Sequence, residues 1–501
     1  MKIVIFAYRF WYGICTSYFK MKEYIFLLGG RRLNMVKIEL FNWLDENAGL
    51  LKHIAQKIWD NPETAYNESF ASKLQASVLQ EAGFKIKMDL ERLPTAFIAE
   101  YGEGKPVIGV LGEYDALSGL SQKKSSKREP VEIGGTGHGC GHNLLGTAGL
   151  GAVLAIKKAI DTGQIKGTVR YYGCPAEEMS GKVFMASLGV FHDLDACFSW
   201  HPASMNVVWG CSFLAVNSVK FNFKGISAHA SAAPHLGRSA LDGVELMNVG
   251  ANYLREHIDE KARIHYTITN GGGKPNIVPA EASVWYYIRA PKRTQVEEIY
   301  ERLVKIAKGA AMMTGTEVDV EFLGGCHDVL PNEILGEIMH INMLEVGPPQ
   351  YTEKDRKFAE ELAESFEPGQ KEKIMKTYFA PEDVIEMTLH EGIAKVDDKN
   401  EIMAGSTDIG DVSWIVPFAQ ITAAAWPVGT AAHSWQSCAS SGSGIGYSAM
   451  MFAAKTMAGA LYDLFMDEGT ILNKAKEEFE NKTKNNKYKS FIPTGERPPS
   501  H

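Results

Sequence analysis

The first part of this chain alternates between short apolar runs and longer stretches in which apolar positions recur every three to four residues. A short apolar run closed by glycine predicts a buried strand, and the longer period predicts a helix. Strands are expected at Lys105–Gly112, Gly167–Gly173 and Leu194–Trp200, and helices at Leu44–Trp59, Glu68–Ala82 and Asn143–Ile160. Strands that alternate with helices predict an α/β fold with a mostly parallel sheet and helices on both of its faces.

The pattern changes between residues 212 and 323. Six elements are expected there, in the order strand, helix, strand, strand, helix, strand: Phe213–Gly225, Arg238–Ile258, Ala262–Thr269, Glu281–Arg289, Gln295–Met313 and Thr316–Phe322. The order β-α-β-β-α-β is typical of a ferredoxin-like unit. The sequence therefore predicts a second, smaller domain in this segment.

The first type of pattern returns in the rest of the chain. Helices are expected at Tyr351–Phe366 and Ile445–Phe465, and a strand at Gln420–Pro427. We therefore expect that residues 35–211 and 324–480 form one metal-binding catalytic domain. The ferredoxin-like domain of residues 212–323 would be inserted into it.

The two ends of the chain depart from these patterns. Residues 1–34 are aromatic and basic, and they lack the apolar core and the small-residue cleavage site of a signal peptide. Their apolar runs are also too short to cross a bilayer. Our hypothesis is that Met35 begins the native protein and that the leader is non-native; an irregular N-terminal extension is the alternative. Residues 481–501 are charged and end in prolines, which predicts a flexible tail.

Composition narrows the classes of partner. Apolar residues make up 45% of the chain and charged residues 22%, which is ordinary for a globular protein. A formal net charge of -8 is mild for 501 residues and argues against nucleic acid as a partner. The seven cysteines are scattered. Without a clear secretion signal they indicate a reducing, cytoplasmic location, and no membrane association is expected.

The densest chemical signal is the segment "GTGHGCGHNLLG" at Gly135–Gly146. In it, Cys140 and His142 lie two residues apart among glycines, at the predicted start of a helix. Glycine permits a sharp turn, and a helix N-terminus favours the thiolate form of cysteine. A thiolate beside an imidazole suits zinc or a similar divalent cation. The alternative is a small buried cysteine next to a histidine that caps the helix.

The second signal is a pair of carboxylates in the segment "CPAEEMSG". Glu177 and Glu178 follow the strand expected at Gly167–Gly173, and the carboxyl ends of such strands form the edge where open α/β sheets build their sites. Adjacent side chains point in different directions. One can therefore bind a metal while the other accepts a proton from water. A solvated surface pair is the alternative explanation.

Three more candidates follow predicted strands. They are His201 in "SWHPAS", His433 in "GTAAHSWQ" and Asp115 in "LGEYDAL". A lone histidine is often structural, and an aspartate is common in turns. Asp115 could instead accept a hydrogen bond from the far nitrogen of a ligating imidazole. Because all these candidates fall at one sheet edge or at a helix start, the sequence favours one shared site.

The ordered segments "GEYDAL", "GHGCGHN", "PAEE", "WHP", "GISAHAS" and "HSWQ" resemble the amidohydrolase branch of peptidase family M-20, which contains metal-dependent aminoacylases and carboxypeptidases. The resemblance covers about Met35 to Asp467. Within that branch, "GCGHNLLGTA", "GSTDIGDVSWIVP" and "HSWQ" are similar to a subgroup that splits p-aminobenzoyl-glutamate into p-aminobenzoate and glutamate. This resemblance implies a hydrolase that cleaves the amide bond of a small N-acyl amino acid.

The resemblance also implies roles for single residues. Two divalent cations would be held by Cys140, His142, Glu178, His201 and His433. Glu177 would be the general base and later the general acid. The inserted domain would close over the site and form a homodimer, or a heteromer with a related subunit. From it, His229 would stabilise the oxyanion across the subunit interface, and Asn276 and Arg289 would grip the substrate carboxylate.

This chain departs from the wider branch at two places. The usual aspartate after Cys-Gly-His is Asn143, and the usual "DMDALP" is "EYDALS", which makes Glu113 only a secondary candidate. Neither change removes a proposed ligand, although Asn143 alters the surroundings of the ligands. The donor types suit zinc and manganese best, and cobalt also fits. A general N-acyl amino acid deacylase or metallo-dipeptidase, and a non-catalytic paralogous subunit, are the alternative functions.

Overall fold

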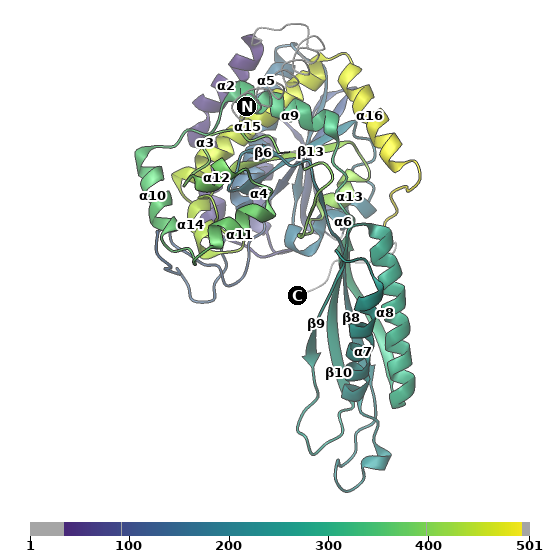
Figure 1. The fold of residues 1–501 in the computed structure, drawn as a ribbon. Helices are drawn as coiled ribbons and strands as arrows, with labels where there is room; N and C mark the ends of the chain where they lie inside the picture. Colours follow the sequence, from purple (N-terminus) through teal and green to yellow (C-terminus); the bar gives the residue numbers. More distant parts are fainter. Residues whose placement is uncertain (1–34, 92, 397, 493–501) are drawn as a thin grey trace, which may run out of the picture.

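The computed structural model describes residues 35–91, 93–396 and 398–492. The predictions for residues 1–34, and for the last nine residues of the expected tail, lie outside this range. The described chain forms a large α/β domain from which a narrow second domain projects (Figure 1). The predicted fold class is confirmed.

The large domain is built on a seven-stranded sheet. Its strands, in spatial order, are β1 (Lys85–Leu90), β2 (Leu93–Glu103), β4 (Gly167–Cys174), β3 (Val107–Glu113), β5 (Ala196–Ala203), β13 (Phe418–Ala424) and β6 (Val207–Val208). The four central strands, from β4 to β13, are parallel to one another. They are the four that the sequence predicted. The antiparallel strands β1, β2 and β6 were not predicted. Strand β1 is largely exposed and therefore has no buried apolar run.

Helices cover both faces of this sheet. One face packs on α2 (Met35–Glu46), α3 (Ala48–Asp60), α4 (Ser69–Glu81), α5 (His142–Asp161), α9 (Glu333–Val346) and α15 (Gly444–Met466). The other face packs on α6 (Gly181–Ser187) and α13 (Ile409–Ser413). Strand β3 sends Val110 to the first face and Leu111 to the second. A strand that is buried on both sides reads as a continuous apolar run, and this is why its sequence was recognisable.

Helix α5 is long and apolar enough to cross a membrane, by length and composition alone. In the structure, 83% of its most apolar window is buried inside the protein. It therefore has the burial of a core helix between the sheet and helices α2, α3 and α15. Its glycines allow close packing: a Cβ on Gly151 would lie 2.8 Å from Leu51 of α3.

The second domain has the predicted ferredoxin-like order. Its elements are β8 (Ala215–Lys224), α7 (Ala240–Leu254), β9 (Arg263–Asn270), β10 (Glu281–Ala290), α8 (Arg293–Thr314) and β11 (Glu317–Cys326). The antiparallel sheet has the order β11-β8-β10-β9, and α7 and α8 cover one face. Along β10, Val284, Tyr286 and Ile288 are buried against these helices, whereas the alternate residues face away. This period-2 alternation is the pattern that predicted the strand.

The remaining elements surround the large domain. They are α10 (Glu353–Ala363), α11 (Gln370–Thr377), α12 (Glu382–Glu386), α14 (Trp435–Ser441), α16 (Thr470–Thr483), the short strands β7 (Ser212–Phe213) and β12 (Ile402–Met403), and the 3-10 helices η1 (Glu177–Met179), η2 (Pro234–Leu236) and η3 (Arg255–His257).

The C-terminal segment after α16 packs where the two domains meet. Tyr488 donates to Asp411 Oδ1 at 3.0 Å, and the ring of Phe491 lies 5.5 Å from that of Phe322 on β11. Phe491 also lies under the guanidinium of Arg293, at the start of α8. Residues 488–492 of the expected tail therefore bridge the large domain and the base of the second domain.

Candidate metal centre

The carboxyl ends of the central strands bring the predicted ligands to one edge of the large sheet. Glu113 ends β3, Glu177 and Glu178 begin η1 just after β4, and His201 lies near the end of β5. This edge is where parallel α/β sheets form their sites. Cys140 and His142 reach it from the start of α5, and His433 from the loop before α14.

The donor atoms form two groups that share Cys140. The donors of Cys140, His142 and His201 lie within 4.8 Å of one another, and so do those of Cys140, Glu178 and His433. The Sγ atom of Cys140 is 3.4 Å from His201 Nε2, and Glu178 Oε1 is 3.0 Å from His433 Nε2. The structure thus brings together all five side chains proposed as ligands. Two adjacent groups around one thiolate have the donor chemistry for two divalent cations.

Local backbone geometry makes this convergence possible. Gly141, between Cys140 and His142, has φ +76°, and a Cβ there would lie 2.9 Å from the ring of Pro202. Only glycine adopts this left-handed conformation without strain. Ala176 (φ 54°) and His433 (φ 56°) adopt it without being glycine. Such residues cost about 1–3 kcal/mol each and cluster at functional sites.

Hydrogen bonds from outside the group orient the imidazoles of His142, which is buried, and His201, which is partly buried. His142 Nδ1 lies 2.8 Å from Asp115 Oδ1, and His201 Nδ1 lies 2.7 Å from the carbonyl oxygen of Pro202. Each acceptor assigns the ring proton to Nδ1 and leaves the Nε2 lone pair facing the other donors. The Nε2 atom of His142 is fully buried and has no hydrogen-bond partner. A buried lone pair of this kind fits a metal ligand, so the residues present suit the group.

Asp115 has a second contact that supports the same geometry. Its Oδ2 accepts the backbone N–H of Glu178 at 3.1 Å. One carboxylate therefore fixes both the ring of His142 and the turn that carries the two glutamates. Asn143 has a different position: it is buried, and its amide donates to the carbonyl oxygen of Ser441 at 3.1 Å. Asn143 thus ties α5 to α14 and is not among the donors.

The charges at this edge shift the acidity of the thiol and the imidazole. Burial opposes ionisation of Cys140, but His142 and His201 outweigh it and hold the pKa of the thiol well below its usual value. Burial likewise lowers the pKa of His142, but Cys140 and Asp115 outweigh it and raise that pKa. The raised pKa of His142 favours a second ring proton, on Nε2, which a divalent cation at that nitrogen would displace.

The structure adds a third donor group that the sequence did not predict. Donors of Glu113, His142 and Glu177 also lie within 4.8 Å of one another. Lys182 and Asp408 stand behind Glu113 and were not considered from the sequence. Two features of the sequence point to this group. One is Glu113 in "EYDALS", and the other is the segment "GSTDIGDVSWIVP", which contains Asp408 and is part of the resemblance.

The predicted residues on the second domain do not meet within one subunit. Asn276 and His229 lie beyond the end of β8 that is far from the large domain, where Ala230 N–H donates to the carbonyl oxygen of Asn276 at 3.0 Å. Arg289 lies at the near end of β10 and donates to Ser406 of the large domain at 2.9 Å. The ten residues of β8 separate the two ends by about 30 Å. His229 therefore cannot reach the metal centre of its own chain.

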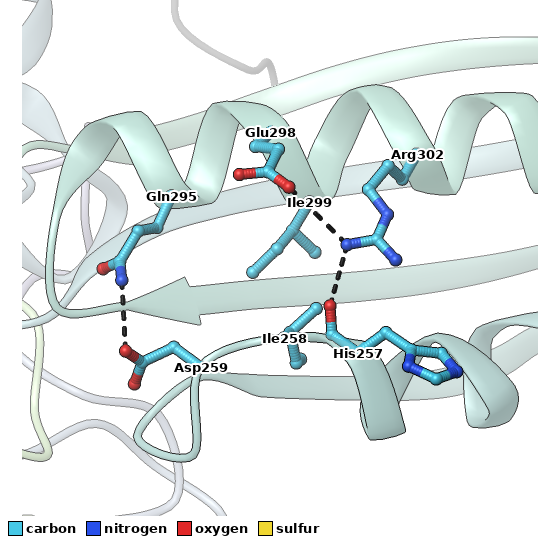
Figure 2. A pocket seen from close by; sticks show the side chains of 7 residues that line it. All are labelled: His257, Ile258, Asp259, Gln295, Glu298, Ile299 and Arg302. Carbon is cyan, nitrogen blue, oxygen red and sulfur yellow. Dashed lines mark hydrogen bonds and ion pairs between the residues drawn. The ribbon is translucent and has the colours of Figure 1, made fainter.

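Figure 2 shows a pocket on the second domain that is separate from this centre. Its volume is about 260 Å³, and it is lined by His257, Ile258, Asp259, Gln295, Glu298, Ile299 and Arg302. Gln295 donates to Asp259 at 3.2 Å, and Arg302 donates to the carbonyl oxygen of His257 at 2.9 Å (Figure 2). The pocket contains none of the candidate ligands, and Gln295 and Arg302 are engaged with other residues of its lining. It is therefore not the candidate active site.

Comparison with known proteins agrees with the geometry. A peptidase dimerisation domain of family M-20 matches residues 216–312. The B subunit of p-aminobenzoyl-glutamate hydrolase from Escherichia coli is 43% identical over 457 residues, which cover 89% of this chain and 95% of that protein. The chain belongs to peptidase family M-20. This confirms the resemblance found in the sequence, and it makes the chain a hydrolase of amide bonds.

Two other matches bear on function and fold. The Xaa-Arg dipeptidase of Homo sapiens is 28% identical over 412 residues, covering 78% of this chain and 80% of that protein. A dinuclear metal-binding M-20 peptidase from Bacillus subtilis has a solved structure that covers 84% of this chain and 99% of its own, with a TM-score of 0.53 and 17% identity. At that identity the second match supports the fold. The matched dimerisation domain of this M-20 chain contains His229, Asn276 and Arg289.

Proposed function

We propose that this chain hydrolyses p-aminobenzoyl-glutamate to p-aminobenzoate and glutamate, using two divalent cations, zinc or manganese. The observation that carries the proposal is the convergence of Cys140, His142, Glu178, His201 and His433 into two donor groups around one thiolate. The substrate is supported by the 43% identity to the B subunit of p-aminobenzoyl-glutamate hydrolase. Bound cations would lower the pKa of the attacking water to roughly 7 and stabilise charge on the carbonyl oxygen.

Glu177 moves the protons in this mechanism. It lies beside the donor groups, but it is absent from the two groups that share Cys140. Burial and then the charges of Glu113 and Asp408 raise the pKa of Glu177, which favours its holding a proton. Positive charge from bound cations acts in the opposite direction and makes it a better base. Glu177 would accept the proton of the attacking water and then donate it to the leaving amine.

His229 is suited to donate a hydrogen bond to the oxyanion. Its Nδ1 accepts the backbone N–H groups of Ser231 and Ala232 at 3.3 and 3.2 Å. These donors assign the ring proton to Nε2, on an exposed side chain. One such donor is worth about 3–4 kcal/mol in the transition state. Because His229 is about 30 Å from its own large domain, we propose that it serves the site of a partner subunit.

The substrate-binding residues would likewise come from two chains. Arg289 would come from the subunit that holds the cations, and Asn276 of the partner subunit would enter together with that subunit's oxyanion donor. The partner is a second copy of this chain or a related subunit of the same hydrolase type. In either case the active site is complete only in the dimer.

An acidic product is favoured over a cationic one by the charges near Arg289. Arg263 lies directly opposite Arg289 on the neighbouring strand. Within residues 35–91, 93–396 and 398–492, no carboxylate forms an ion pair with either guanidinium. Like charges opposite each other destabilise a sheet unless something compensates. The carboxylate side chain of a glutamate product would compensate the two guanidinium charges. The cationic side chain of an arginine product, as in an Xaa-Arg dipeptidase, would be repelled by them.

The decisive experiment measures amino acid release by the purified chain. The substrates are p-aminobenzoyl-glutamate, other acyl-glutamates, acyl derivatives of neutral amino acids, and dipeptides that end in arginine. We expect fastest release from p-aminobenzoyl-glutamate. Equal rates for all acyl groups would support a general deacylase, and faster release from the dipeptides would support a metallo-dipeptidase. No turnover unless a related, second type of subunit is added would support a non-catalytic role for the chain alone.

A mixing experiment tests the shared site. We expect Glu177→Gln and His229→Ala to be inactive separately. A mixture of the two variants, denatured and refolded together, forms dimers in which one of the two sites has an intact Glu177 and an intact His229 of the partner subunit. Activity should therefore return to about a quarter of the wild-type value at equal mixing, since half of the dimers are mixed and each has one intact site. No recovery would contradict the exchange of His229 between two copies of this chain.

A further inference from the structure

Lys182 is a fully buried lysine whose ammonium lies between two carboxylates behind the metal centre. Its Nζ is 2.7 Å from Glu113 Oε1 and 2.6 Å from Asp408 Oδ1, and all three side chains are at most 1% exposed. The backbone N–H of Lys182 donates to the other oxygen of Asp408 at 2.7 Å. Glu113 ends β3, Lys182 lies in the first turn of α6, and Asp408 precedes α13. One ammonium thus fixes three segments that are distant in sequence.

The second oxygen of Glu113 faces the unpartnered nitrogen of His142. Glu113 Oε2 lies 3.4 Å from His142 Nε2, and both groups are fully buried. Since His142 Nδ1 is hydrogen-bonded to Asp115, only its Nε2 is left to face this carboxylate oxygen. Two buried acceptors at this distance repel each other unless a proton or a cation lies between them. Glu113 Oε2 accepts no hydrogen bond within the described chain, so the place between it and His142 Nε2 is open to that proton or cation.

We propose that Glu113 is a further donor to the cation held by His142, and that Lys182 is the positioning residue that holds Glu113 for this role. This inference rests on the proposed function, because it assumes bound cations. The ammonium occupies Oε1, so only Oε2 is directed at the site. When Glu113 Oε2 binds the cation held by His142, Glu177 need not bind it and remains able to accept and donate protons.

Lys37 provides a matched control for burial and charge. It is 4% exposed, and its Nζ lies 2.6 Å from Glu345 Oε2 and 2.7 Å from Asp463 Oδ2. It joins helices α2, α9 and α15, and within the described chain its ammonium donates to Asn342, Glu345 and Asp463, none of which is a candidate ligand. Lys37→Met and Lys182→Met therefore remove the same kind of buried ion pair. Only Lys182→Met should affect the cations.

The test measures zinc binding separately from turnover. Wild type, Glu113→Gln, Lys182→Met, the double variant and Lys37→Met are stripped with a chelator. They are then titrated with zinc in competition with a fluorescent chelator, and their Tm values are recorded. We expect Glu113→Gln and Lys182→Met each to weaken one of the two zinc sites by about 10–100-fold, the usual effect of removing a group that orients a ligand. The double variant should lose no more than Glu113→Gln alone, because Lys182 acts through Glu113.

Each other outcome has a defined meaning. Wild-type zinc affinity in Glu113→Gln, which keeps the shape of the side chain, would overturn the proposal. A Lys182→Met variant that loses only thermal stability, as Lys37→Met should, would overturn the positioning role of Lys182. A wild-type chain that binds no zinc or manganese would instead refute the proposed function, and the inference with it.

Discussion

The assignment of the two adjacent glutamates is the prediction on which the mechanism depends most. Glu178 contacts His433 and shares a donor group with Cys140, whereas Glu177 belongs only to the group of Glu113 and His142. Glu177→Gln keeps the shape of the side chain but removes its ability to accept a proton. Turnover should therefore fall while both cations stay bound.

The size of the effect follows from the role. General acid–base catalysis contributes about 10²–10⁴-fold. At 1.36 kcal/mol for each factor of ten, this is about 3–5 kcal/mol of transition-state stabilisation. Glu177 acts as the base and then as the acid, so we expect the upper part of this range, in kcat and with little change in KM.

The assay follows p-aminobenzoate release by absorbance, and elemental analysis of the same samples gives the metal content. Glu178→Gln is the matched control, because it makes the same chemical change at the neighbouring residue. We expect the control to lose metal as well as activity. Loss of metal by Glu177→Gln, with metal retained by Glu178→Gln, would show that the two roles are reversed.

Three other predictions concern the surroundings of the site and the stability of the fold. Asp115→Asn should weaken metal binding by about 10–100-fold in a chelator competition, because it disturbs the partner of His142; unchanged affinity would contradict this role. Burial lowers the pKa of His390 from 6.5 to about 4. The free energy of unfolding should therefore fall as the pH drops from 6.5 towards 4. In urea titrations, the His390→Gln variant should lose less of its free energy of unfolding over this pH range than the wild type. Phe491→Ala should destabilise the chain by about 1–3 kcal/mol in urea denaturation, and no loss would mean that the C-terminal contacts at the domain junction add little.

Sequence patterns predicted the elements that are buried in a regular way. The central strands β3, β4, β5 and β13 are buried on both sides, and β10 alternates from Val284 onward, so each has a pattern that is visible in the sequence. Strand β1 was missed because most of its residues are exposed. The helix expected at Leu44–Trp59 is in fact parts of two helices, α2 and α3, with a break at Asn47. Asn47 donates its side-chain amide to the carbonyl oxygen of Trp43, a local contact that periodicity does not detect.

The candidate ligands could be predicted because each one follows a buried strand or begins a helix. The orientation of their rings could not, since it depends on contacts such as that between His142 and Asp115, 27 residues away. The separation of His229 from its own large domain also depends on the direction of β8 in space, and no local pattern gives this direction.

The two departures from the wider branch have a common electrostatic explanation. Asn143 donates its amide to the carbonyl oxygen of Ser441, so an aspartate there would direct a carboxylate at an acceptor. At position 113 the opposite applies, because Glu113 meets an ammonium on one side and an imidazole lone pair on the other. The chain thus has a neutral amide where two carbonyl oxygens accept from it and a carboxylate where cations can neutralise it. The carboxylate of Glu113 therefore lies beside His142, where an additional donor to a bound cation would be effective.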